Sequence, residues 1–135
     1  YAIKIQNIKI NSKAEQGIIC NSTLMKILLD NILINAQKHG FDSKEQSNEV
    51  VIDLSVLDEN LILDIKNNGK KFPKGFDKEK FIAKYSTANP NKGNGIGGYD
   101  INRIIEYFNG NWDLILNEDA IYPVRFRIQF PIKTI

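Results

Sequence analysis

The sequence predicts an α+β domain in which one mixed, mainly antiparallel sheet carries its helices on one face. Three observations lead to this fold class. Residues 1–10 and 124–132 alternate apolar and polar side chains, which is the period of a half-buried strand. Residues 22–40 and 99–108 repeat apolar side chains at the helical period instead. The chain order is strand, helix, two strands, a long glycine-rich loop, helix and two strands, which is typical of a two-layer α/β sandwich.

The first long helix is the segment around which the chain is organised. Asn21 or Ser22 is a suitable N-cap for it, and Gly40 is a suitable C-terminal stop. The helix is apolar almost all round, but Asn31 and Asn35 lie four residues apart and therefore share one line of its surface. An unpaired buried amide costs about 1–3 kcal/mol. We therefore expect either a local backbone partner or a polar group that meets this helix from outside.

The second half of the chain predicts a hairpin, two helices and a second strand pair. A tight turn at residues 58–60 separates the two hairpin strands, and Gly110 ends the last helix. Residues 77–84 have weak helical character. The expected elements are strands at 50–57 and 61–66, helices at 77–84 and 99–108, and strands at 112–117 and 124–132.

Length and composition bound the possible functions. The chain has 135 residues, enough for a single domain over residues 1–135, and we expect a longer parent protein because the chain begins with Tyr1. The net charge of +2 and the scattered lysines indicate no nucleic-acid partner. One cysteine and one histidine exclude a disulfide framework and a multi-histidine metal centre. No apolar run reaches the roughly 20 residues that cross a bilayer. We expect a cytoplasmic segment without membrane contact, and the parent's anchoring stays open.

A glycine-rich segment, Lys92 to Gly98 (KGNGIGG), leads directly into the last helix. Glycines let backbone N–H groups approach an anion, and a helix N-terminus adds unsatisfied donors, so this segment could hold phosphate groups. A flexible linker would have the same composition. The segment is not a Walker loop, because no Lys-Ser or Lys-Thr follows its last glycine. It is not a dinucleotide fingerprint either, because a loop precedes it.

Three motifs in order are more specific than any one of them. A helix ends in NILINAQKH, a strand runs into NNGKKFP, and GNGIGGYDI begins the last helix. This order resembles the nucleotide-binding domain of sensor histidine kinases and their relatives, the GHKL ATPases, which include gyrase and the mismatch-repair and heat-shock chaperone ATPases. The resemblance spans residues 18–132 and implies a Bergerat-type ATP-binding fold with ATP and Mg²⁺ as cofactors.

The first motif, by this resemblance, holds the metal and faces the phosphates. Asn35 is similar to the ligand of the Mg²⁺ that bridges the ATP phosphates, and its amide oxygen is a suitable hard donor. Lys38 and His39 resemble phosphate-facing residues, although a solvated helix end would explain them as well. Asn31 stands where the hydrolysing members carry a glutamate. An amide cannot take a proton, and asparagine at this place is typical of the kinases. We therefore predict Asn31 and Asn35 as the catalytic positions.

The second motif resembles the first glycine box, with Gly69 as its glycine, and it departs from the family pattern. The family usually has aspartate at the position of Asn67, where it receives the adenine amino group. Asn67 can accept without charge, so the bond should be weaker, and its amide could also donate to a guanine oxygen. Val124 stands where the family commonly has threonine. These two changes leave base recognition open.

The third motif resembles the second glycine box, which wraps the phosphates. The segment before it, residues 74–92, would be the ATP lid, with Phe76, Phe81 and Tyr85 as apolar anchors or as plain packing against the sheet. The residues that the resemblance places at the nucleotide in this box are Lys92, Gly93, Asn94, Gly95, Ile96 and Gly97.

The resemblance implies the catalytic domain of a sensor histidine kinase. Such a domain positions Mg-ATP for transfer of the γ-phosphate to a histidine of a separate helical dimerisation domain, which we expect in the same parent protein. Without that phosphoacceptor domain the chain should bind nucleotide and transfer nothing. A GHKL module that switches conformation or association without phosphotransfer is the alternative. A degenerate domain that only contacts proteins is a third, against which Asn35 and the glycines of GNGIG argue.

Overall fold

The computed structural model describes residues 7–12, 18, 21–36, 48–69, 72–84, 97–117 and 121–132 of the chain. Eight elements follow one another in this part of the chain: β1 (Asn7–Ser12), α1 (Ser22–Asn35), β2 (Glu49–Leu57), β3 (Asn60–Asn67), α2 (Lys78–Lys84), α3 (Gly97–Tyr107), β4 (Asn111–Leu116) and β5 (Val124–Pro131).

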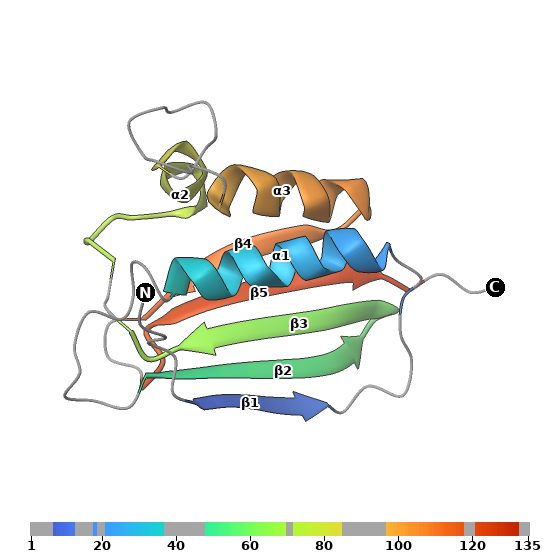
Figure 1. Cartoon of the computed structure of the whole chain (residues 1–135), viewed down its shortest axis with the longest axis horizontal. Helices are drawn as coiled ribbons and strands as arrows, with labels where there is room; N and C mark the ends of the chain where they lie inside the picture. The colour runs from blue at the N-terminus through green and yellow to red at the C-terminus, as the bar shows by residue number, and fades with distance from the viewer. Residues whose placement is uncertain are drawn as a thin grey trace.

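The strands form one five-stranded sheet in the order β1-β2-β3-β5-β4. The β1 and β2 strands are parallel, and the other three pairings are antiparallel. All three helices lie on one side of this sheet, which makes two layers (Figure 1). The predicted fold class, a mixed and mainly antiparallel sheet with helices on one face, is therefore confirmed.

The core lies between the two layers and is rich in aromatic rings. Phe81 of α2 is fully buried and contacts Trp112 and Phe126 edge-on, at centroid distances of 5.9 and 5.3 Å. The Trp112 indole Nε1–H donates to Asn102 Oδ1 of α3 at 2.9 Å, and Lys78 Nζ donates to the Trp112 carbonyl at 2.8 Å. These contacts tie α2 and α3 to β4, and they place Phe81 in plain packing against the sheet.

The turns follow the local chemistry of the sequence. Asp58 and Glu59 both have positive φ, which closes the β2–β3 hairpin with a two-residue turn. Asn21 is the N-cap of α1, where its Oδ1 accepts from Leu24 N at 3.1 Å. At Gly110, a Cβ atom would lie 2.6 Å from the Gln129 carbonyl oxygen, so only glycine allows the α3–β4 connection to approach β5 this closely.

Some boundaries and faces differ from the sequence prediction. The first strand continues to Ser12, because residues 11 and 12 still pair with β2. The α1 helix is less buried than its apolar composition indicates: Ile27 and Ile34 are 40% and 42% exposed, since only one side of α1 packs on the core. The predicted stop at Gly40 lies outside the described residues.

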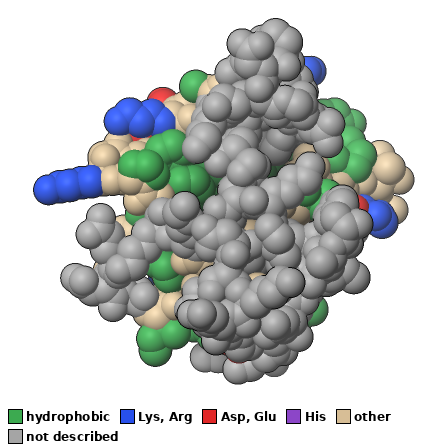
Figure 2. Space-filling view, turned by 60° about the vertical axis from the view of Figure 1, so that its left-hand side comes forward, with side chains coloured by type: hydrophobic (Ala, Val, Ile, Leu, Met, Phe, Trp, Pro, Cys, Tyr) green, Lys and Arg blue, Asp and Glu red, His purple; other side chains and the backbone are tan. Residues whose placement is uncertain are grey.

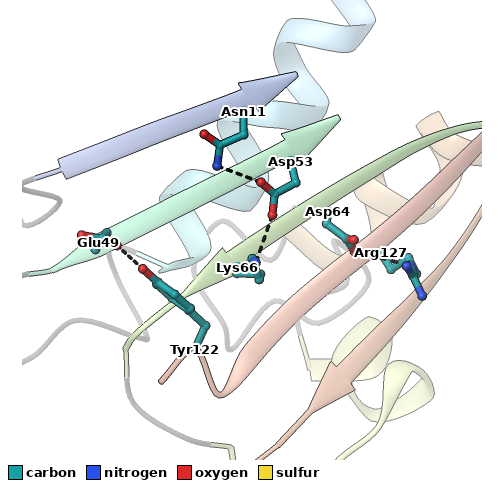
Figure 3. A network of polar contacts seen from close by, with 7 residues as sticks. All are labelled: Asn11, Glu49, Asp53, Asp64, Lys66, Tyr122 and Arg127. Carbon is teal, nitrogen blue, oxygen red and sulfur yellow. Dashed lines mark hydrogen bonds and ion pairs between the residues drawn. The ribbon is translucent and has the colours of Figure 1, made fainter. Parts of the chain in front are cut away.

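The opposite face of the sheet carries polar side chains (Figure 3). Asp53 accepts from Asn11 Nδ2 at 2.9 Å and pairs with Lys66 Nζ at 2.9 Å. These two contacts, Asn11 first, hold the Asp53 pKa below its ordinary value of 3.8. The Tyr122 hydroxyl donates to the Glu49 carboxylate, and this bond raises the Tyr122 pKa above its ordinary value of 10.0. This polar network lies on the face of the sheet that points away from the helices.

Candidate functional site

Four chain segments end or begin at the same end of the sandwich (Figure 1). The C-terminal end of α1, the end of β3, the start of β5 and the N-terminal end of α3 all lie there. The sheet register agrees, because Asn67 pairs with Val124, and Val124 pairs with Leu116 at the end of β4. Motifs that are far apart in the sequence therefore meet at one end of the molecule.

The two amides of α1 lie on its buried side. Asn35 is 7% exposed and follows Leu28 and Ile32 among the buried residues of the helix. The Asn31 Nδ2 atom is buried, and no hydrogen-bond partner for it exists among the described residues. Buried amides are normally paired, so an unpaired one near the end of a helix indicates a place where a further polar group can bind.

The end of β3 is fixed by its own side chains. Asn67 is 5% exposed, and its Oδ1 accepts from the Gly69 N–H at 2.9 Å. Asn68 turns to the neighbouring strand, where its side-chain Oδ1 accepts from the Glu49 backbone N–H at 2.8 Å. The backbone N–H of Asn68 donates to the Glu49 carbonyl oxygen at 3.2 Å. The NNG sequence therefore makes a turn that is hydrogen-bonded to β2, and Asn67 lies on the helical side of the sheet.

Val124 lies beside Asn67 and is 3% exposed. A cavity of about 300 Å³ opens at the same end of the sheet, between the segment after β3 and the β4–β5 connection. Phe72 and Phe76 stack on each other in its wall, with ring centroids 4.4 Å apart. The cavity is lined by Phe72, Pro73, Lys74, Gly75, Phe76, Leu116, Asn117 and Pro123.

Sequence reasoning missed this cavity because its two walls meet only once β3 pairs with β5. The two walls are at least 40 residues apart in the sequence, and no short motif joins them. The proline-containing stretches FPKGF and YPV were the available signals, since each interrupts regular pairing next to a strand.

The described residues include only part of the predicted site. The structure brings the end of α1, with Asn31 and Asn35, to the same end of the molecule as Asn67 and Gly69 of the turn after β3. Gly97 is the first residue of α3. The remaining predicted site residues lie outside the described residues: Lys38, His39, Lys92, Gly93, Asn94, Gly95 and Ile96.

The surface of this end comes forward in Figure 2. Among the described residues in this view, the Lys and Arg side chains lie apart from one another near the outline, and hydrophobic side chains are visible in several separate places. In the part of the chain that is described, none of the helices is long and apolar enough to cross a membrane.

The class of this domain follows from comparison with known protein families. The model of the histidine kinase-, DNA gyrase B- and HSP90-like ATPases matches residues 20–134. The chain therefore belongs to this family of ATPases, and ATP is the nucleotide that membership implies.

Solved histidine kinases have the same fold. The mycobacterial sensor histidine kinase MprB superposes with a TM-score of 0.73 at 17% identity, over 96% of this chain and 83% of that one. The catalytic domain of histidine kinase ThkA gives 0.71 at 20%, over 93% and 78%. The blue-light activated histidine kinase of Erythrobacter litoralis gives 0.61 at 16%, over 93% of this chain and 37% of that longer one. No curated protein matches the chain.

Proposed function

We propose that this chain is the catalytic, ATP-binding domain of a sensor histidine kinase. It would position Mg-ATP so that a histidine of a separate helical domain can attack the γ-phosphate. Membership of the ATPase family and the likeness of the fold to histidine kinase domains support this proposal. Catalysis by such a domain consists mostly of positioning and charge neutralisation.

The donor set of α1 fits a magnesium-bound nucleotide. Asn35 is buried and would offer an amide oxygen, a hard ligand that suits Mg²⁺. Mg²⁺ when bound would neutralise phosphate charge and keep several of its own waters. Lys38 and His39 are proposed to face the phosphates one turn further on. The glycine box from Lys92 to Gly97 would cover the phosphates with backbone N–H groups.

The asparagine at position 31 favours a kinase domain rather than an ATPase that hydrolyses ATP with water. Its Nδ2 atom is buried and has no hydrogen-bond partner among the described residues, so it could donate to a ligand or a water. An amide cannot accept the proton of an attacking water, and general-base hydrolysis is therefore disfavoured at this position. The γ-phosphate would be kept for an acceptor that arrives from another domain.

A switch module without phosphotransfer is the second candidate. The Asn67 and Val124 pair favours it, because this pair departs from the usual adenine-reading residues of the family. In either case the segment would work in the cytoplasm, and the kinase candidate requires a phosphoacceptor helical dimerisation domain in the parent protein.

Hydrolysis by the isolated chain tests the role of Asn31. We expect release of phosphate from ATP to stay well below several turnovers per minute, and Asn31→Glu to raise it by supplying a base. Wild-type hydrolysis at several turnovers per minute would contradict the proposal.

Phosphate transfer in the longer parent protein separates the two candidates. With γ-labelled ATP, the kinase proposal expects acid-labile, alkali-stable label on a histidine outside residues 1–135. A parent protein that takes up no label but changes its association state with nucleotide would be the switch.

A further inference from the structure

Glu49, the first residue of β2, holds the turn that follows β3 through its backbone. Its N–H donates to Asn68 Oδ1 at 2.8 Å, and its carbonyl oxygen accepts from the Asn68 backbone N–H at 3.2 Å. Asn68 lies between Asn67 and Gly69, which bond to each other at 2.9 Å. Glu49 therefore sets where the turn with two of the predicted site residues lies relative to the sheet.

The side chain of Glu49 holds a second segment, the connection between β4 and β5. The Tyr122 hydroxyl donates to the Glu49 carboxylate (Figure 3). Tyr122 directly precedes Pro123, whose carbonyl oxygen accepts from the Asn117 N–H at 3.0 Å. The bond from Tyr122 therefore attaches to β2 a connection whose two flanks are joined to each other.

The two segments that Glu49 holds lead to the two walls of the cavity at this end of the sheet. One wall, residues 72–76, follows the turn after β3, and the other is formed by the residues that flank the β4–β5 connection. The ring of Tyr122 has a further neighbour, because Lys66 Nζ lies 5.6 Å from its centroid. One residue of β2 thus joins both walls, by its backbone on one side and by its carboxylate on the other.

We propose that Glu49 and Tyr122 are positioning residues of the nucleotide site, which set the gap between these two walls and thereby the affinity for Mg-ATP. The inference rests on the proposed nucleotide-binding function. Both side chains lie on the face of the sheet that points away from the helices, so they act through the turn after β3 and the β4–β5 connection (Figure 3). A binding site keeps its geometry only where supporting hydrogen bonds hold its walls.

The bond between a hydroxyl donor and a carboxylate acceptor allows a rescue test. Glu49→Gln keeps an oxygen that can accept from the Tyr122 hydroxyl, whereas Glu49→Leu has a similar size and no acceptor. Tyr122→Phe removes the hydroxyl and keeps the ring beside Lys66. None of these variants changes the backbone groups of Glu49 that hold Asn68, so each one tests the bond between the two side chains.

Calorimetric titration with ATP in Mg²⁺ measures the effect. We expect Tyr122→Phe and Glu49→Leu each to weaken binding by about three- to tenfold, and Glu49→Gln by less than about twofold. The double variant should bind no more weakly than either single variant, because both substitutions remove the same bond. Asp53→Asn is the matched control: Asp53 belongs to the same polar face, and its substitution should keep the wild-type affinity.

The outcomes separate this role from the function on which it rests. Unchanged affinity in Tyr122→Phe and Glu49→Leu, an equal loss in Asp53→Asn, or an equal loss in Glu49→Gln and Glu49→Leu would overturn the positioning role alone. Absence of ATP binding by the wild-type chain would overturn both. Circular dichroism before titration identifies a variant that does not fold, and the other single variant then decides the matter against the same control.

Discussion

Asn31 allows a sharp test, because a residue that serves a ligand lowers stability when the ligand is absent. Its buried Nδ2 has no partner among the described residues, and such an atom costs about 1–3 kcal/mol. Asn31→Leu removes that atom and also replaces a weak helix former by a good one, worth about 0.5 kcal/mol. We therefore expect the free energy of unfolding to rise by about 1–2 kcal/mol after the shape change is allowed for.

Asn102→Leu is the matched control, the same substitution in another helix. Asn102 is half-buried like Asn31, but its amide is fully used: Oδ1 accepts from Trp112 Nε1 at 2.9 Å, and Nδ2 donates to Glu106 at 3.1 Å. Trp112 is 2% exposed, so the substitution leaves a buried indole N–H unpaired. The unfolding free energy should fall by about 1–2 kcal/mol despite the gain in helix propensity.

Urea denaturation followed by circular dichroism measures both variants, and thermal unfolding gives a second reading. One kcal/mol corresponds to about 3–5 °C in Tm for a domain of this size. The two variants should therefore move in opposite directions and differ by about 2–4 kcal/mol. If Asn31→Leu lowers the unfolding free energy as much as Asn102→Leu does, then the Asn31 amide has a hydrogen-bond partner within the chain and is not left unpaired for a ligand.

Three further predictions concern the scaffold. Gly110→Ala should lower the unfolding free energy by about 1–3 kcal/mol, because its Cβ would lie 2.6 Å from the Gln129 carbonyl oxygen. Urea denaturation measures this change, and an unchanged midpoint would contradict the close approach. The lowered Asp53 pKa means that its contribution is complete above the unfolded carboxyl pKa and is lost as pH falls through the folded one. Asp53 and Lys66 are partly exposed, so we expect wild type to be more stable than Asp53→Asn by about 0.5–1 kcal/mol near neutral pH. This difference should shrink below pH 4, and a difference that is constant with pH would contradict the lowered Asp53 pKa. The raised Tyr122 pKa gives the opposite sign, because its contribution to stability is present below pH 10 and is lost above it. Tyr122→Phe should therefore reduce the loss of stability with rising pH in the alkaline range. A tyrosinate absorbance titration in which no phenol ionises later than the others would contradict the bond to Glu49.

The sequence predicted the fold well because the periodic segments were long and their order was informative. The alternation of VRFRIQF predicted β5, and the structure buries Val124, Phe126, Ile128 and Phe130 on one face. The all-round apolar composition of α1 was less informative. It did not predict that Ile27 and Ile34 would remain partly exposed. Only one face of α1 packs on the sheet, and an all-round apolar sequence does not indicate which face that is.

The candidate site could be predicted as residue types but not as orientations. The motif order pointed to Asn31, Asn35 and Asn67, and all three have buried polar atoms. The direction of the Asn67 amide depends on a bond to Gly69 two residues on, and its neighbours in the sheet are valines that two other strands bring beside it. Such cross-strand neighbours follow from sheet register, which a short motif does not contain.

The central claim is that this chain binds a magnesium nucleotide at the end of α1, and Asn35→Ala tests it most directly. Calorimetric titration of wild type and variant with a purine nucleoside triphosphate, with and without Mg²⁺, is the measurement. Asn11→Ala, on the opposite face of the sheet, is the control. We predict micromolar to sub-millimolar binding that weakens at least about tenfold without Mg²⁺ and in Asn35→Ala, but not in Asn11→Ala. Binding that is the same in wild type and Asn35→Ala would contradict the account and favour a domain that only contacts other proteins.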